Sequence, residues 1–256
     1  IEVGKMRKIK RVFIFGRGGC YISGLVLREV LKSLGSEIEV NVGEGNLKSC
    51  DFFVLVSYSG NTKEVLKFFE KLKVEMRGRK ELEKKSLIFT SGGKLLEVAK
   101  KNNLSFIKLP EDLYPRFTFS YTFFPLLKFF SEEKEGERFV KNLVKVLGKE
   151  KKKIEREAVR LVLKLKNKYP LFYSTPSLYP AAYRLQTALE EDAKILCHAN
   201  KITELFHNEL EVLPDKRFFP VLLIDKEEVK DFERQLRYFK KVIEESYEFP
   251  YWKYKK

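Results

Sequence analysis

The stretch Phe52-Phe53-Val54-Leu55-Val56-Ser57-Tyr58-Ser59-Gly60-Asn61-Thr62 decides the fold, because an unbroken apolar run leads directly into hydroxyls, a glycine and an amide. A short apolar run bounded by turn residues is typical of a strand that is buried on both faces. A helical pattern follows from Thr62 to Val74. Hydroxyls and backbone amides at the start of a helix can hold a phosphate dianion without a lysine. The stretch therefore predicts a buried strand that ends in a phosphate-binding turn.

The same turn has a plainer interpretation as an ordinary helix start. Asn61 or Thr62 would cap the helix, and Glu64 would lie in its first turn. A cap of this kind needs one side-chain oxygen, whereas Ser57, Ser59 and Thr62 supply three hydroxyls. The surplus favours the phosphate site.

Apolar runs of the same kind recur before and after this strand, and helical patterns separate them. The expected strands are 12–15, 38–42, 52–57, 87–91 and 106–109, and the expected helices are 22–34, 62–74 and 94–101. Alternation of strand and helix implies a parallel sheet with helices on both faces. In such a sheet the loops at the carboxyl ends of the strands form the ligand crevice.

The pattern starts again in the second half of the chain. An aromatic helix at 121–130 and a long charged helix precede it, and it consists of strands at 171–174 and 218–224 with helices at 179–194 and 226–246. The tail, 247–256, shows no period. We therefore expect an α/β protein with a first subdomain over 8–131, a connecting helical segment over 132–168 and a smaller second subdomain over 169–256.

Composition argues against several classes of function. The net charge of +15 invites a nucleic-acid interpretation, but the basic residues alternate with glutamates over 134–168 and 226–245, as on the solvated faces of helices. No apolar run approaches the roughly 18 residues that span a bilayer, and residues 1–11 lack a signal-peptide core. We expect a cytoplasmic protein that binds neither nucleic acid nor membrane.

The cysteines and histidines are too few and too scattered for a metal centre. They are Cys20, Cys50, Cys197, His198 and His207. This spacing matches neither a disulfide framework nor a zinc knuckle. We expect reduced thiols and no metal.

Gly16-Arg17-Gly18-Gly19 follows the first strand and precedes a helix, where glycines let backbone amides approach an anion. A dinucleotide fingerprint needs a third small residue, but Tyr21 stands there, and Glu44 matches poorly the acidic residue expected about 20 residues further on. We expect no organic cofactor. A tight turn without ligand is the structural alternative.

Taken together, these motifs resemble a known family. They are GRGG at 16–19, SYSGNTKE at 57–64, TSGGKL at 90–95, PR at 115–116, LEEDAK at 189–194 and ELFHNE at 204–209. Their order resembles the sugar isomerase (SIS) domain, and specifically the archaeal-type bifunctional phosphoglucose/phosphomannose isomerases, from about Arg11 to Pro214. SxSGNTxE is specific for the domain, and the glutamate and HNE motifs point to the isomerases.

The resemblance implies two SIS subdomains, a homodimer and a bound hexose 6-phosphate. It assigns the phosphate to Ser57, Ser59, Thr62, Gly18, Gly19 and Cys20. Family members commonly carry a serine where this chain has Cys20. A thiol is a weaker hydrogen-bond donor than a hydroxyl, so the substitution weakens the expected site.

The resemblance also assigns three catalytic residues. Arg116 would lie beside the reacting carbons, Glu191 would transfer the proton, and His207 would open the sugar ring from the neighbouring subunit. Such chemistry requires a carboxylate base, a cation near the enediolate oxygens and an acid/base group near pKa 7. Taken singly, each residue could instead be an ordinary surface charge or loop residue.

The predicted activity is the interconversion of glucose 6-phosphate and fructose 6-phosphate through a cis-enediol(ate). Whether mannose 6-phosphate is a second aldose substrate is left open. The family continues past another strand and helix to a segment with a threonine and a lysine, which we do not find up to Lys256. We therefore expect the second subdomain to be shortened. A sugar-phosphate-binding protein without efficient catalysis is the alternative.

Overall fold

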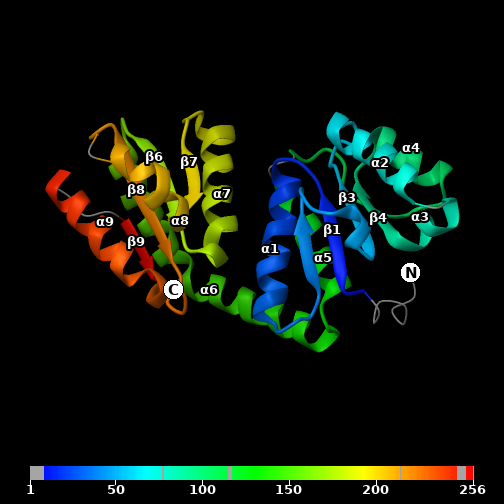
Figure 1. Ribbon diagram of the computed structural model, residues 1–256, viewed down its shortest axis with the longest axis horizontal. Coiled ribbons are helices and arrows are strands. Elements are labelled where there is room, and N and C mark those ends of the chain that lie inside the picture. The colour runs from blue at the N-terminus through cyan, green and yellow to red at the C-terminus, as the bar shows by residue number, and fades with distance from the viewer. Residues whose placement is uncertain (1–8, 77, 115–116, 214, 247–251, 256) are drawn as a thin grey trace. The chain divides into compact units, whose positions relative to one another are not determined.

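The computed structural model describes residues 9–76, 78–114, 117–213, 215–246 and 252–255. The chain divides into two compact units, 1–141 and 142–256, each built on one sheet (Figure 1). The boundary lies within the long helix α6 (Glu133–Leu165). Predicted residue Arg116 lies outside the described residues.

The first unit contains a sheet in which every neighbouring pair of strands is parallel. Its strands are β1 (Arg11–Phe15), β2 (Glu39–Val42), β3 (Phe52–Val56), β4 (Ser86–Thr90) and β5 (Ser105–Lys108), in the order β2-β1-β3-β4-β5. All five residues of β3 are buried, as its apolar run predicts. The predicted parallel α/β architecture is confirmed.

Helices cover both faces of this sheet (Figure 1). They are α1 (Gly19–Ser33) and α5 (Phe119–Phe130) on one face, and α2 (Lys63–Glu75), α3 (Arg79–Lys85) and α4 (Gly93–Lys101) on the other. The helix α3 was not predicted, because its seven residues are almost all charged and only Leu82 reaches the core. A 3₁₀ turn, η2 (Leu47–Ser49), precedes β3.

The strand order fixes where a ligand can lie. The chain leaves β1 for α1 on one face and leaves the adjacent β3 for α2 on the other face. A crevice opens at such a switch point, outside the carboxyl ends of the two strands. The loops Gly16–Gly19 and Ser57–Thr62 stand at this point.

The second unit has a smaller parallel sheet. Its described strands are β6 (Tyr169–Ser174), β7 (His198–Lys201), β8 (Phe218–Ile224) and β9 (Trp252–Lys255), in the order β7-β6-β8-β9. The tail shows no period in the sequence, but residues 252–255 form a strand that pairs with β8. The sequences of β7 (HANK) and β9 (WKYK) lack the apolar runs from which the other strands were predicted, so neither strand was expected.

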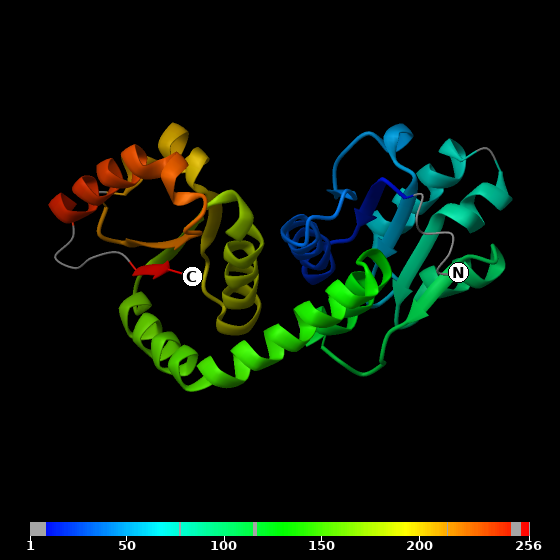
Figure 2. The same ribbon diagram turned by 90° about the horizontal axis from the view of Figure 1, so that it is seen from below.

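Helices also flank the second sheet, with α7 and α9 on opposite faces (Figures 1 and 2). The elements are η4 (Pro176–Leu178), α7 (Tyr179–Ala188), the π-helical turn η5 (Leu189–Ala193), α8 (Ile202–Glu204), the π-helical turn η6 (Leu205–Glu209), η7 (Leu210–Val212), η8 (Val229–Phe232) and α9 (Glu233–Ser246). On one face of the sheet, Leu165 of α6 and Ala182 of α7 pack with Phe172 and Val221. On the other face, Phe239 of α9 belongs to a separate core cluster.

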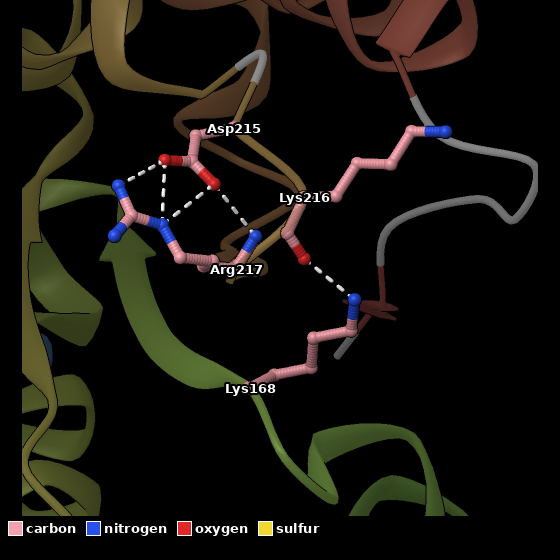
Figure 3. A network of polar contacts seen from close by, with 4 residues as sticks. All are labelled: Lys168, Asp215, Lys216 and Arg217. Atoms are coloured by element: carbon pink, nitrogen blue, oxygen red, sulfur yellow. Dashed lines mark hydrogen bonds and ion pairs between the residues drawn. The ribbon is translucent and has the colours of Figure 1, made fainter.

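A polar network closes the turn before β8 (Figure 3). The ammonium of Lys168 donates to the carbonyl of Lys216 at 2.5 Å, and Arg217 pairs with Asp215 at 2.6 Å. The Arg217 guanidinium lowers the pKa of the Asp215 carboxyl through hydrogen bonds. The amide of Tyr169 donates to the carbonyl of Arg217, so the network joins the beginnings of β6 and β8. This is the amino end of the sheet, away from the ligand edge, and the role of the network is structural.

Among the described residues, no helix is both long enough and apolar enough to cross a membrane. The 33 residues of α6 have the length, but Lys, Arg and Glu recur throughout the helix.

Candidate functional site

The hydroxyls of the predicted phosphate turn meet at the start of α2. Ser57 is buried at the end of β3, and its Oγ lies 2.8 Å from Oγ1 of Thr62. Thr62 occupies the N-cap position, but its side chain makes no capping hydrogen bond. Ser59 is exposed, and its Oγ accepts from the amide of Asn61 at 3.2 Å. The ordinary-cap interpretation therefore fails, because no side chain among the described residues caps α2.

A second turn, Thr90–Leu95, braces the first from the next strand. The carbonyl of Tyr58 accepts from the amide of Ser91 at 2.9 Å and from the Ser91 hydroxyl at 2.7 Å. The side chain of Asn61 accepts from the amide of Lys94 at 3.1 Å rather than capping α2. The TSGGKL motif thus holds the phosphate turn in place.

Backbone contact between the two turns requires a glycine at position 60. Gly60 has a φ of +65°, a conformation that residues with a side chain rarely adopt. A Cβ added to Gly60 would collide with the carbonyl oxygen of Gly92. The carbonyl of Gly60 also accepts from the amide of Leu95 at 2.9 Å. The conformation of the turn thus depends on two backbones in direct contact.

The glycine loop after β1, Gly16–Gly19, is the last part of the predicted phosphate site. Gly18, with a φ of +54°, precedes α1, which has no side-chain cap. Burial raises the pKa of the Cys20 thiol, and a smaller opposing effect comes from its hydrogen bond with the Tyr58 backbone. This bond places Cys20 against the phosphate turn. Because the thiol stays protonated near neutral pH, it adds no negative charge beside an anion.

The predicted phosphate residues fall on one unit, and the predicted catalytic residues Glu191 and His207 fall on the other. Ser57, Ser59, Thr62, Gly18, Gly19 and Cys20 belong to the first. Glu191 lies exposed in η5, and its backbone carbonyl accepts from the ammonium of Lys194 at 2.7 Å. His207 is exposed in η6. The assigned catalytic roles of these residues and of Arg116 stay predictions.

A polar cluster that was not predicted from the sequence surrounds Glu209, two residues after His207. The carboxylate of Glu209 accepts from the side-chain amide of Asn200 at 2.6 Å and lies 3.1 Å from Nε2 of His198. Tyr173 forms a third hydrogen bond with it. A signal was available, because Glu209 belongs to the same HNE motif as His207 and because His198 and Asn200 fall on one side of a strand. Detecting it required a prediction of β7.

The cluster does not form a metal site. No group of three or more His, Cys, Asp or Glu residues in the described part of the chain is placed to hold a metal ion.

Comparison with known proteins shows which proteins the chain is similar to. Residues 154–250 match the model of the bacterial phosphoglucose isomerase C-terminal SIS domain. The C-terminal domain of glucosamine-fructose-6-phosphate aminotransferase from Francisella tularensis shares the fold, with a TM-score of 0.69 and 17% identity over 99% of this chain and 78% of that chain. Over residues 154–250 the chain is thus similar to this SIS domain, and the solved structure shows that the fold is shared.

Two curated relatives show which enzymes the chain resembles in sequence. A bifunctional phosphoglucose/phosphomannose isomerase from Caldicellulosiruptor bescii is 33% identical over 80% of this chain. A D-glucosamine-6-phosphate 4-epimerase from Sulfolobus acidocaldarius is 28% identical over 87% of this chain and 71% of its own length. The predicted resemblance to the bifunctional isomerases is confirmed. The chain spans 63% of the length of the Caldicellulosiruptor isomerase.

The Gly60 contact makes a testable prediction. Gly60→Ala forces an unfavourable φ and a backbone collision, and should lower the free energy of unfolding by about 2–4 kcal/mol. Gly35→Ala is the matched control, because Gly35 also has a positive φ but no atom near its added Cβ. The control should lose only about 1 kcal/mol. Urea unfolding measures both, and equal losses would contradict the proposed contact.

Proposed function

We propose that the chain is an aldose–ketose isomerase that interconverts glucose 6-phosphate and fructose 6-phosphate, with mannose 6-phosphate as a further aldose. The uncapped phosphate turn at the switch point of the first sheet carries the proposal. A dianion there would meet the hydroxyls of Ser59 and Thr62 and the amides that open α2. The named isomerase relative supports a hexose 6-phosphate as the owner of that phosphate.

The proposed proton transfer uses Glu191. Its carboxylate takes the proton from C2 of the open-chain aldose and returns it to C1 of the cis-enediolate, while a proton passes from O2 to O1. A positioned carboxylate of this kind contributes about 10²- to 10⁴-fold to the rate. Arg116 would stabilise the negative charge on the enediolate oxygens. Exposure of the Glu191 side chain is compatible with access to a substrate.

Ring opening is assigned to His207. Its imidazole would take the proton of the C1 hydroxyl and deliver a proton to the ring oxygen. The exposed position of His207 in η6 supports a role toward a ligand or a neighbouring subunit. The working assembly is therefore proposed to be a homodimer in which His207 serves the partner's site.

One assay tests the activity directly. Purified chain is mixed with fructose 6-phosphate and a chelator, and formation of glucose 6-phosphate is followed through a coupled dehydrogenase. Turnover that survives the chelator supports the proposal. Absence of turnover, together with saturable protection against thermal unfolding by fructose 6-phosphate, would favour a sugar-phosphate-binding protein instead.

The epimerase relative makes hexosamine phosphates a second substrate class. Incubation with glucosamine 6-phosphate, followed by chromatography of the sugar product, separates this candidate from the isomerase. A C4 epimer with no reaction of fructose 6-phosphate would replace the proposed activity.

Glu191→Gln should reduce kcat by about 10²-fold or more, because the amide cannot accept the proton. Binding of fructose 6-phosphate, followed by thermal protection, should stay within about 2-fold of the parent, because the phosphate turn lies on the first unit. Glu190→Gln is the control, since it removes the same charge from the adjacent residue. Full activity in Glu191→Gln would remove Glu191 from the mechanism.

Cys20→Ser should strengthen binding of fructose 6-phosphate by about 2- to 10-fold, because a hydroxyl is the better donor and such a bond is worth about 0.5–1.5 kcal/mol. Isothermal titration measures the effect. Cys50→Ser, at the amino end of β3, is the control and should leave the affinity unchanged. Weaker binding in Cys20→Ser would show that the thiol position does not face the phosphate.

A further inference from the structure

We propose that Glu209 is a positioning residue, whose carboxylate clamps the turn that presents His207 to the edge of the second sheet. The clamp itself is a property of the folded chain. Its effect on catalysis rests on the proposed function of His207.

The turn has an inner and an outer side. Ile202, Leu205 and Leu213 are fully buried against the second core, whereas His207 is exposed. Glu209 lies one π-helical turn after Leu205, and only 22% of its side chain is exposed. Glu209 is thus the polar residue on a side that is otherwise apolar.

The carboxylate of Glu209 collects donors from two adjacent strands. Tyr173 on β6 and Asn200 on β7 are direct partners in the strand register. Asn200 donates at 2.6 Å, His198 lies at 3.1 Å, and Tyr173 adds a further hydrogen bond. Three side chains of the sheet thus hold one side chain of the turn.

The charge on Glu209 strengthens the clamp. Burial raises the pKa of the carboxyl, but the hydrogen bonds from Asn200, Tyr173 and His198 outweigh that effect, so the pKa lies below its ordinary value. His198 and Tyr173 are the titratable groups that the structure places against it. Glu209 is therefore ionised near neutral pH, and hydrogen bonds to a charged group are stronger than those between neutral groups.

The negative charge of Glu209 distinguishes the hydrogen bonding of His198 from that of His207. An ionised carboxylate can only accept hydrogen bonds, so Nε2 of His198 must carry a hydrogen. The ring of His198 therefore donates a hydrogen bond to Glu209. Within the described residues, the ring of His207 makes no hydrogen bond or ion pair and stays available to a ligand.

Imidazole NMR of the full chain without substrate tests the clamp. The sequence contains only two histidines, so a long-range ¹H–¹⁵N spectrum shows two rings, which a His207→Gln variant assigns. In the parent, His198 should appear as a species that carries hydrogen at Nε2. In Glu209→Gln this signature should be lost, and the amides of residues 205–209 should exchange with solvent at least about 10-fold faster.

Two further variants keep the test decisive. Glu211→Gln removes an exposed charge from the same segment and should behave as the parent. Glu209→Asp keeps the carboxylate and should restore part of the amide protection. An unchanged His198 signature and unchanged exchange in Glu209→Gln would overturn the proposal, whatever substrate the protein acts on.

Thermal unfolding at several pH values gives an independent measurement. A carboxyl whose pKa falls on folding stabilises the folded state above its unfolded pKa, near 4.5, and loses that contribution as the pH falls through the folded value. The difference in Tm between the parent and Glu209→Gln should be full at pH 7 and shrink below about pH 4.5. A constant difference would contradict an ionised clamp.

Kinetics then separates positioning from binding. If the parent isomerises fructose 6-phosphate, Glu209→Gln should lower kcat by about 10-fold and change KM less than about 2-fold, because small displacements of a catalytic group are costly. If the parent has no activity, the proposed function fails while the NMR result still decides on the clamp.

Discussion

The geometry of the predicted phosphate turn depends on the carbonyl oxygen of Tyr58. It receives hydrogen bonds from the amide and hydroxyl of Ser91, and a longer one from Thr90. These bonds tie the turn after β3 to the turn after β4, and the contact between Gly60 and Gly92 leaves no room for a side chain between them. Because Tyr58 and Gly60 are both fixed by these contacts, the hydroxyls of Ser57 and Thr62 can lie together without a side-chain cap on α2. The site is thus prepared before any ligand arrives.

The described strands of the second unit, β7-β6-β8-β9, repeat the order β2-β1-β3-β4 of the first unit, but a carboxylate of the chain itself lies at the position equivalent to the predicted phosphate site. The loop after β6 corresponds to the glycine loop after β1, and the loop after β8 corresponds to the phosphate turn after β3. In the second unit, Glu228 accepts from the amide of Ser177 at 3.2 Å and from its hydroxyl at 2.9 Å. An anion supplied by the chain itself satisfies donors that could otherwise attract a phosphate. This contrast favours one phosphate site, on the first unit.

The part of the fold that could be predicted from the sequence is the part decided by local patterns. The apolar run of β3 defines a strand buried on both faces, and the hydroxyls after it define the turn. The strand β7 and the clamp of Glu209 could not be predicted, because the four residues of β7 show no apolar period and the partners of Glu209 come from β6 and β7. The TSGGKL motif at Thr90–Leu95 was recognised in the sequence. Its hydrogen bonds to Tyr58 and Asn61 could not be predicted, because they join residues far apart in the chain.

Net charge and the phosphate turn contribute to recognition in different ways. The net charge of +15 would attract the proposed sugar phosphate dianion from a distance but would not distinguish it from other anions. That attraction is screened beyond about 8 Å at physiological ionic strength. The described side chains at the turn are neutral, namely Ser57, Ser59, Thr62 and the protonated thiol of Cys20. Neutral donors in fixed positions select by geometry, so in the proposed function the turn would select among anions and the surface charge would set the rate of arrival.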